Sequence, residues 1–270
     1  MPSWQEKFSS CFRQGKRCVR MVKIKRCKSG LRIQIMVIFA VSKKTEQMRN
    51  IAVILAGGTG SRMGVSEPKQ FLEIAGRLVI EHAIDAFESH EGVDEIAVVM
   101  HPSYIARMQE IIVRNAWKKF GKLLGGGEER FMSSLAAIRA YENVPDANLL
   151  LHDAARPWIS QEIIARLVEA LKTHEAVGVG IPSTDTVWEV REGVIASIPD
   201  RRNMWRAQTP QAFRLPLIRE AYERALQDPH FQATDDCGVL MRYMPQVKIH
   251  IVEGSEKNFK ITYLQDVELR

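Results

Sequence analysis

The sequence predicts a single α/β domain over residues 48–270, built on a mostly parallel, twisted sheet flanked by helices and carrying a protruding β-arm. From Asn50 onward, short runs of β-branched residues alternate with amphipathic segments of helical length, which is the pattern of parallel strands joined by helices. No internal repeat and no Gly/Ser-rich linker divides this stretch. With 46% hydrophobic residues, the 270-residue chain can bury a full core, which excludes fibrous and wholly disordered classes.

Five strands and five helices are expected along this domain. The strands are the apolar or β-branched runs at residues 51–55, 95–100, 149–152, 177–181 and 248–252. The helices are the segments with apolar residues three or four positions apart, at residues 78–89, 103–117, 132–141, 161–173 and 215–226. This order of elements predicts helices on both faces of one sheet.

Residues 182–206 interrupt the alternation. Pro182 is followed by two strand-like runs, 187–190 and 194–198, with a turn at Gly193 between them. The segment is therefore predicted to be a β-hairpin that leaves the sheet as an arm. Because such an arm buries little surface by itself, we expect it to contact a second subunit.

The positive charge of the chain is concentrated at its N-terminus. The whole sequence has a net charge of +6, yet residues 1–47 hold 12 Lys and Arg against two acids, and residues 48–270 hold 26 against 30. The net charge of the body is therefore −4. A negative body argues against a basic protein that binds nucleic acid, which is the non-enzymatic alternative. Its one cysteine, Cys237, is typical of a cytoplasmic protein.

The first 47 residues allow several interpretations. The apolar run from Ile33 to Val41 is about half of the roughly 20 residues that a transmembrane helix needs, so no membrane association is predicted. Lys43 and Lys44 stand where a secretory cleavage site belongs, whereas the basic, acid-poor first thirty residues fit an organellar transit peptide. Because Met48 immediately precedes a strand, we interpret residues 1–47 as a basic extension that is disordered or belongs to a mis-assigned start.

A glycine-rich loop, residues 56–64, directly follows the first strand. In an open α/β sheet, ligands bind beyond the carboxyl ends of the strands. Met63 stands where the dinucleotide fingerprint has its last glycine, and no GK[ST] closes the loop as in Walker A. Backbone N–H groups, together with Arg62 and Lys69, suit a triphosphate. The alternative is a tight turn with two solvated cations.

The string AGGTGSRMGVSEPKQFL at residues 56–72 resembles the cytidylyltransferases that act on 2-C-methyl-D-erythritol 4-phosphate or on pentitol 5-phosphates, within the sugar-nucleotide pyrophosphorylase superfamily. Further motifs similar to those of the family follow in order. They are GG-x-x-R-x-x-S at 126–133, HDAARP at 152–157, DT at 185–186, DR at 200–201, TPQ at 209–211, TD at 234–235 and N-x-K-x-T at 258–262. Each motif is weak alone, but jointly they extend the resemblance over residues 51–267.

The resemblance implies a Rossmann-like nucleotidyltransferase domain and assigns roles to residues of these motifs. The implied catalytic residues are Arg62, Lys69, Arg201 and Lys260, of which the last two hold the phosphate of the acceptor. The implied substrate-binding residues are Ala56, Gly57, Gly58, Gly60, Gly126, Arg130, Ser133, Asp153, Arg156, Asp185, Thr186, Thr209 and Thr234.

Asp153 also has a role that its position suggests. It follows the strand at 149–152, so its carboxylate lies at a carboxyl end of the sheet and could bind Mg²⁺ or a sugar hydroxyl. The alternative is a helix cap after Pro157. We expect Mg²⁺ to bridge triphosphate oxygens with mostly water as its other ligands.

The function that these patterns favour is cytidylyl transfer from CTP to the polyol phosphate 2-C-methyl-D-erythritol 4-phosphate, with release of pyrophosphate, in isoprenoid precursor synthesis. The attacking phosphate is already ionised, so catalysis needs alignment and charge neutralisation rather than a general base. The resemblance implies a homodimer joined through the arm. Because Arg201 lies close to the return of the arm, we expect it to complete the acceptor site of the neighbouring subunit. The alternatives are ribitol or ribulose 5-phosphate as acceptor, a hexose-phosphate nucleotidyltransferase, and an organellar location.

Overall fold

The computed structural model describes residues 12–14, 17–19, 24–25, 34–35, 48–58, 67–127, 129–144, 146–263 and 265–268. The chain divides into two units, Met1–Gln47 and Met48–Arg270. In the first unit, β1 (Phe12–Gln14) pairs with β2 (Arg17–Val19) and β3 (Ile24–Lys25) pairs with β4 (Gln34–Ile35), both antiparallel. Most of residues 1–47 lie outside the described residues, so the expectation for this extension stays a prediction. Within the part of the chain that the structure describes, no helix is long and apolar enough to cross a membrane.

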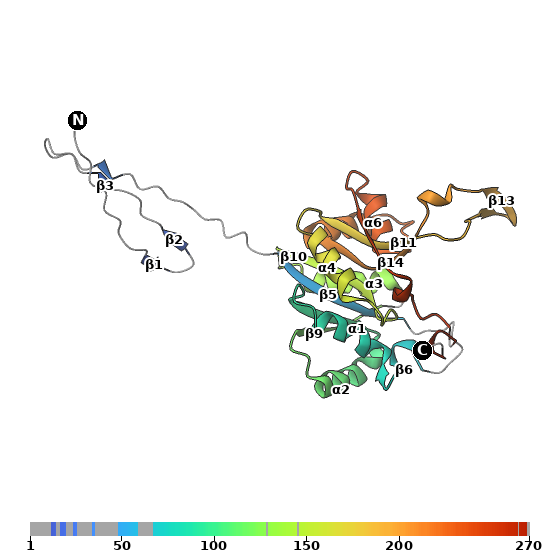
Figure 1. Cartoon of the computed structure of the whole chain (residues 1–270), viewed down its shortest axis with the longest axis horizontal. Helices are drawn as coiled ribbons and strands as arrows, with labels where there is room; N and C mark the ends of the chain where they lie inside the picture. Colours follow the sequence, from blue (N-terminus) through green and yellow to red (C-terminus); the bar gives the residue numbers. More distant parts are fainter. Residues whose placement is uncertain are drawn as a thin grey trace. The chain divides into compact units, whose positions relative to one another are not determined.

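A seven-stranded sheet forms the centre of the second unit (Figure 1). Its strands are β5 (Arg49–Ala56), β8 (Glu95–Met100), β9 (Phe120–Gly125), β10 (Ala147–Asp153), β11 (Ala176–Pro182), β14 (Trp205–Arg214) and β15 (His250–Glu253). They lie in the order β15-β11-β14-β10-β5-β8-β9. β14 runs antiparallel to its neighbours β10 and β11, and all the other pairs are parallel. The predicted mostly parallel α/β sheet is confirmed.

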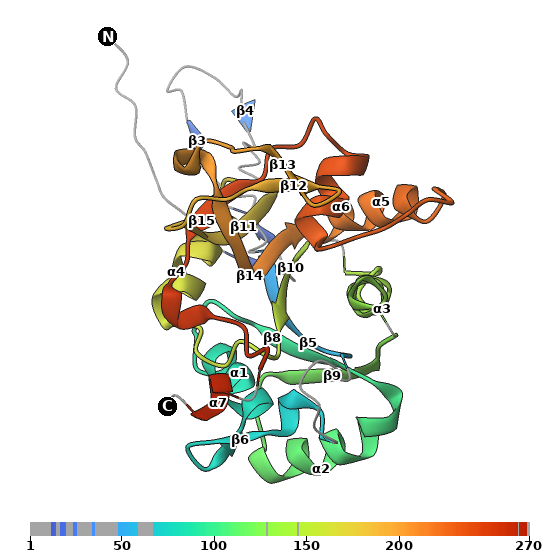
Figure 2. The same ribbon diagram turned by 90° about the vertical axis from the view of Figure 1, so that its right-hand side faces the viewer.

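Helices cover both faces of this sheet (Figure 2). One face carries α1 (Val79–Glu88), α2 (Ile105–Asn115) and α4 (Gln161–Ala170), and the other carries α3 (Arg130–Ala140), α5 (Leu215–Ala225) and α6 (Asp236–Tyr243). Alternate residues of β5 enter the two cores, because successive side chains of a strand point to opposite faces: Ile54 packs in one core and Val53 in the other. Both faces of β5 are therefore buried, as in most parallel sheets.

Shorter elements complete the domain. They are the two-stranded hairpin of β6 (Glu73–Ile74) and β7 (Arg77–Leu78), the 3₁₀ helices η2 (Lys69–Phe71), η3 (Pro102–Tyr104), η4 (Arg201–Asn203) and η5 (Glu256–Asn258), and the terminal helix α7 (Gln265–Glu268). The segment from η2 to β7 connects the glycine-rich loop to α1. Lys69, one of the predicted site residues, is the first residue of this segment.

The sequence pattern does not predict β9, β14 and α6. β9 contains two glycines and a lysine and lies at an edge of the sheet, where an apolar run is not required. β14 contains Pro210 and two glutamines, which argue against a central strand, yet it lies between β10 and β11. Its pairing with β11 shifts register between Gly178 and Val179. Propensity is therefore overridden here by tertiary pairing.

The predicted hairpin within residues 182–206 is present (Figure 1). β12 (Glu189–Arg191) and β13 (Val194–Ser197) form a two-stranded sheet of their own. The turn residues Glu192 and Gly193 have φ of 49° and 79°, which is the left-handed geometry that two-residue hairpin turns favour. Every side chain from residue 184 to residue 198 is exposed. The use of this hairpin as an arm toward a second subunit stays a prediction.

Candidate active site

Asp153, the buried last residue of β10, lies at the centre of a cluster of charged side chains. Arg130 Nε donates to Asp153 Oδ1 at 3.2 Å, Lys260 Nζ donates to Oδ2 at 2.8 Å, and Arg156 Nε is 3.6 Å from Oδ2. Arg130 begins α3, Arg156 lies in the turn after β10, and Lys260 belongs to the C-terminal segment after η5. The structure thus brings four predicted site residues together from three distant parts of the chain.

The charges in this cluster stabilise one another. Burial alone would raise the pKa of Asp153, but the positive charges of Arg130 and Lys260 outweigh burial and hold that pKa well below its usual range. Burial alone would lower the pKa of Arg130, but Asp236 and Asp153 raise it above its ordinary value. Burial lowers the pKa of Arg156, which Asp153 only partly offsets. Asp153 is therefore a permanent carboxylate that organises three cations.

Arg130 is shared between two carboxylates. Its Nη1 donates to Asp236 Oδ2 at 2.6 Å, and the fully buried Asp236 also accepts from the Tyr222 hydroxyl at 2.6 Å. Within the described residues, Arg130 Nη2 and Arg156 Nε are buried and have no hydrogen-bond partner. Buried N–H groups without a partner are rare in folded proteins. Beside a cluster with more cations than carboxylates, these two groups indicate an anion-binding site.

A neutral histidine holds the turn after β10 in place. His152 Nε2 faces the Arg156 carbonyl at 3.0 Å and therefore donates to it, which leaves Nδ1 as an acceptor. The Thr209 hydroxyl accepts from Asp153 N–H at 3.1 Å and donates to His152 Nδ1 at 3.1 Å. Burial lowers the pKa of His152 to about 4, so the ring stays neutral as this arrangement requires. Thr209 thus contacts His152 and Asp153, and its role in substrate binding stays a prediction.

The start of the glycine-rich loop meets α3 at Ser133. A Cβ at Gly57 would lie 2.5 Å from Ser133 Oγ, and a Cβ at Gly126 would lie 2.7 Å from the same atom. Only glycine allows this close approach at both positions. The structure therefore brings the predicted residues Gly57, Gly126 and Ser133 together. The predicted Gly60 and Arg62 lie outside the described residues.

Two side chains of η2 link the loop to the charge cluster. Gln70 Nε2 donates to the carbonyls of Ala56 and Gly58, at 3.1 and 3.2 Å. Lys69 Nζ donates to the carbonyl of Ile261 at 3.2 Å, one residue after Lys260. The predicted Ala56, Gly58 and Lys69 are therefore connected through one short helix.

Four predicted residues are not brought to Asp153 within one chain. Arg201 lies at the base of the hairpin, where its Nη1 donates to the Thr184 carbonyl at 3.0 Å. Arg201, Asp185, Thr186 and Thr234 are all exposed. Across the described ranges, no hydrogen bond or ion pair joins any of them to the Asp153 cluster. Their roles in the site stay predictions.

Sequence reasoning missed three residues of this site: His152, Gln70 and Asp236. His152 and Gln70 are each directly next to a residue that was assigned a role, and Asp236 directly follows the TD motif at 234–235. Each is also at most 2% exposed in the structure. The sequence shows that these polar residues lie in or beside the motifs, but it does not show which residues they hydrogen-bond.

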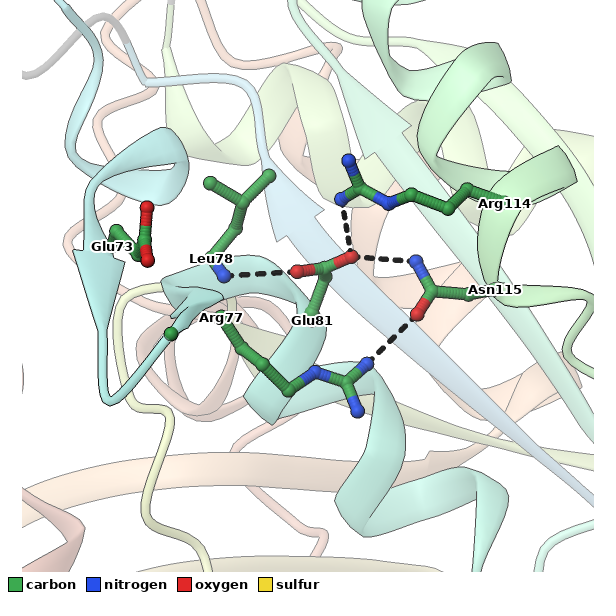
Figure 3. Close-up of a pocket in the computed structure, with 7 residues that line it drawn as sticks. Glu73, Arg77, Leu78, Glu81, Arg114 and Asn115 are labelled. Atoms are coloured by element: carbon green, nitrogen blue, oxygen red, sulfur yellow. Dashed lines mark hydrogen bonds and ion pairs between the residues drawn. The ribbon is translucent and has the colours of Figure 1, made fainter.

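A separate surface pocket of about 320 Å³ lies beside the β6–β7 hairpin, lined by Glu73, Gly76, Arg77, Leu78, Glu81, Arg114 and Asn115 (Figure 3). The Glu81 carboxylate accepts from Arg114 at 2.6 Å, from Asn115 at 2.5 Å and from the Leu78 N–H at 2.9 Å. Arg77 donates to the Asn115 side chain at 2.8 Å. These groups satisfy one another and tie α1 to the end of α2. None of the lining residues belongs to the predicted site.

Comparisons with known proteins identify relatives of this chain. The family model for IspD, 2-C-methyl-D-erythritol 4-phosphate cytidylyltransferase, matches residues 50–269. The 2-C-methyl-D-erythritol 4-phosphate cytidylyltransferase of Thermobifida fusca (strain YX) is 46% identical over 226 residues, which cover 81% of this chain and 90% of that protein. The bifunctional ribulose 5-phosphate reductase/CDP-ribitol pyrophosphorylase Bcs1 of Haemophilus influenzae is 39% identical over 217 residues, 79% of this chain and 46% of that protein.

The fold is similar to that of solved structures as well. The crystal structure of 4-diphosphocytidyl-2C-methyl-D-erythritol synthase from Anaerococcus prevotii DSM 20548 superposes with a TM-score of 0.73 at 27% identity, covering 83% of this chain and 94% of that one. Sequence and fold agree over the region that contains the Asp153 cluster. The chain therefore belongs to the 2-C-methyl-D-erythritol 4-phosphate cytidylyltransferase family.

Proposed function

We propose that this chain is an enzyme that transfers a cytidylyl group from CTP to 2-C-methyl-D-erythritol 4-phosphate, with release of pyrophosphate, in isoprenoid precursor synthesis. Beyond family membership, one observation supports the proposal most strongly. The half-buried cations Arg130, Arg156 and Lys260 surround a single buried carboxylate, Asp153, and two of their N–H groups have no hydrogen-bond partner within the described residues. Such a site suits phosphate groups.

The chemistry follows from the charge of the reactants. A phosphate oxygen of the acceptor attacks the α-phosphorus of CTP, a new P–O bond forms, and the bond to pyrophosphate breaks. The attacking oxygen is already ionised, so the enzyme supplies alignment and positive charge. Lys260 holds the acceptor phosphate, while Lys69 and Arg62 stabilise the charge that builds on the triphosphate. Asp153 keeps Lys260 and Arg130 oriented.

The described part of the site could hold a divalent metal only with one carboxylate and with phosphate oxygens and water as the other ligands. Among the described residues, no group of three or more His, Cys, Asp or Glu side chains could hold a metal ion. Asp153 offers one carboxylate, which already accepts from Arg130 and Lys260. One carboxylate suffices for Mg²⁺ that is held mainly by phosphate oxygens and water. When bound, Mg²⁺ would neutralise negative charge on the triphosphate, with Asp153 as its protein ligand.

The acceptor and the nucleotide are tested by one panel of assays on the full chain. Pyrophosphate release should require CTP and 2-C-methyl-D-erythritol 4-phosphate together, and it should fall sharply when UTP or GTP replaces CTP. Ribitol 5-phosphate is the second candidate acceptor, because the CDP-ribitol pyrophosphorylase is 39% identical over the matched region. Faster turnover with ribitol 5-phosphate than with the methylerythritol compound would reject the first assignment and support the second.

A matched pair of lysines tests the charge cluster. Lys260→Ala removes the ammonium group that lies 2.8 Å from Asp153, and it should lower kcat by roughly 10²- to 10³-fold. Lys257 is exposed and stands three residues earlier in the chain, so Lys257→Ala is the control and should leave kcat unchanged. Equal kcat values for the two variants would contradict the role of Lys260.

We further propose a cytoplasmic homodimer joined through the hairpin of β12 and β13. The hairpin exposes apolar side chains, with Trp188 58%, Val194 69% and Ile198 60% accessible, which suits contact with a second copy. Arg201 at its base is then available to the acceptor site of the neighbouring subunit. The cytoplasmic location is supported by the single cysteine of residues 48–270, Cys237.

Subunit mixing distinguishes a shared site from a site within one chain. Lys69→Ala and Arg201→Ala are each expected to be inactive alone. If Arg201 acts across the dimer, each mixed dimer regains one intact site of two, and random assembly makes half of the dimers mixed. About a quarter of wild-type activity should then return. Subunits that exchange without any recovery would show that Arg201 acts within its own chain.

A further inference from the structure

The side chain of Gln70 is buried beneath the start of the glycine-rich loop. It is 2% exposed, and its amide nitrogen lies 3.1 Å from the Ala56 carbonyl and 3.2 Å from the Gly58 carbonyl. A side-chain amide nitrogen carries two N–H donors. Gln70 thus holds two carbonyls that flank Gly57.

Holding the carbonyls also fixes the direction of the backbone N–H. In a planar trans peptide, the carbonyl and the next N–H point in opposite directions. The hydrogen bond to the Ala56 carbonyl therefore turns the Gly57 N–H away from Gln70. Ser133 limits the loop on another side, because any Cβ at Gly57 would collide with its Oγ. The first residues of the loop are confined by two independent contacts.

The support beneath Gln70 does not depend on the loop. The neighbouring Phe71 is 2% exposed and packs against Tyr104, with ring centroids 5.4 Å apart. The Phe71 N–H donates to the Pro68 carbonyl at 2.9 Å, and the Val79 N–H donates to the Leu72 carbonyl at 2.9 Å. η2 is therefore anchored to the core, and the two hydrogen bonds from Gln70 hold the start of the loop against η2.

We propose that Gln70 is a positioning residue for nucleotide binding: its amide sets the first three residues of the loop, 56–58, so that the backbone N–H of Gly57 receives the triphosphate of CTP. Preformed N–H donors bind phosphate without a cost of ordering at the moment of binding. This inference rests on the proposed CTP-dependent activity.

The residue type follows from this role. Glutamine can donate to two carbonyls at once, whereas a carboxylate of the same size accepts only and would face two carbonyl oxygens. Methionine has a similar length and keeps the apolar packing, but it provides no donor. Gln70→Glu and Gln70→Met therefore remove the same two hydrogen bonds in different ways. Gln70→Met keeps roughly the volume of the side chain without adding a charge.

The matched control lies on the surface of the same domain. Gln161 Nε2 donates to the Ala86 carbonyl at 2.7 Å, so Gln161→Glu and Gln161→Met remove a similar amide-to-carbonyl bond away from the loop. The full chain and the four variants are compared by three measurements. These are the Tm without ligand, the Kd of CTP from calorimetry, and the KM of the acceptor at saturating CTP.

We expect Gln70→Met and Gln70→Glu to raise the Kd of CTP roughly 10- to 100-fold, while the KM of the acceptor changes less than about threefold. The Gln161 variants should leave both values unchanged. A purely structural role would lower the Tm of the Gln70 variants and leave the Kd of CTP within about twofold of wild type, which would overturn the inference. Wild-type protein that does not bind CTP would overturn the proposed function, and this inference with it.

Discussion

Replacing Gly57 by alanine tests whether the glycine-rich loop is packed directly on α3. An ideal Cβ at Gly57 would lie 2.5 Å from Ser133 Oγ, a separation that real Cβ atoms essentially never show. Ser133 is 2% exposed, and the Cβ position of Gly126 is only 2.7 Å from the same oxygen. The hydroxyl is therefore enclosed between two glycines. Gly58 provides the control, because no atom of the residues that the structure describes lies within 4 Å of its Cβ position.

The magnitude follows from the contact that alanine would create. Neither Gly57 nor Gly58 has a positive φ, so alanine strains the backbone at neither position. Overpacking at Gly57 should cost about 1–3 kcal/mol of unfolding free energy, which lowers the Tm of a domain of this size by roughly 2–12 °C. Gly58→Ala should be neutral or slightly stabilising, because it reduces the entropy of the unfolded chain.

A double variant isolates the clash. Without the Ser133 hydroxyl, the nearest atoms to a Cβ at Gly57 are the Gly127 carbonyl oxygen at 3.5 Å and Ser133 Cβ at 3.7 Å, which are ordinary contacts. Gly57→Ala combined with Ser133→Ala should therefore recover most of the lost stability, with a coupling of about 0.5–3 kcal/mol. Urea unfolding of the wild type, the three single variants and the double variant measures it. Equal stability of Gly57→Ala and Gly58→Ala, or additive effects in the double variant, would refute the packing argument.

Three further predictions concern stability. As the pH falls from about 6.5 to about 4, the unfolding free energy should fall by about 3 kcal/mol. The reason is that burial lowers the pKa of His152 to about 4, so the unfolded chain binds a proton that the native ring does not. Urea titrations in which the unfolding free energy of His152→Asn falls with pH as steeply as that of the wild type would contradict this. Asp236→Asn weakens the 2.6 Å pair between the fully buried Asp236 and Arg130, and it should cost about 3–5 kcal/mol of unfolding free energy. Glu169→Gln removes the charge from an exposed 2.5 Å pair with Lys172 and should change stability little in the same titrations. A protein of residues 48–270 alone should keep the Tm and kcat of the full chain, because these residues contain both cores and the family match at 50–269. A lower Tm or kcat of this shorter protein would show that residues 1–47 contribute to stability or activity.

The parts of the fold that follow from local pattern could be predicted from sequence. β8 is a run of six buried residues and appears at 95–100 as expected, and β10 and β11 extend the expected runs by one or two residues at each end. β14 could not be predicted in this way. It pairs with two neighbouring strands that come from elsewhere in the chain, and its own composition argues against a strand.

The same limit explains which site residues could be predicted. Asp153 follows a predictable strand, so its place at the edge of the sheet was accessible from sequence. Asp236 depends on β14: Gln211 of that strand accepts from the Asp236 and Cys237 N–H groups, both at 3.0 Å, and donates to Asp235 at 2.8 Å. The strand thereby places the start of α6 beside Arg130. A contact across 106 positions that passes through an unpredicted strand leaves no local signal.

The charge balance of the site connects its stability to its function. Two buried carboxylates, Asp153 and Asp236, face the three cations Arg130, Arg156 and Lys260, so the cluster has one more cation than it can pair internally. Burial of an uncompensated cation is costly, and removing one partner of such a cluster is more costly still. A phosphate group supplies the missing negative charge and can accept from the unpartnered N–H groups of Arg130 and Arg156. We therefore expect the surplus positive charge to destabilise the folded chain without substrate and to favour phosphate binding, as where stability is exchanged for function.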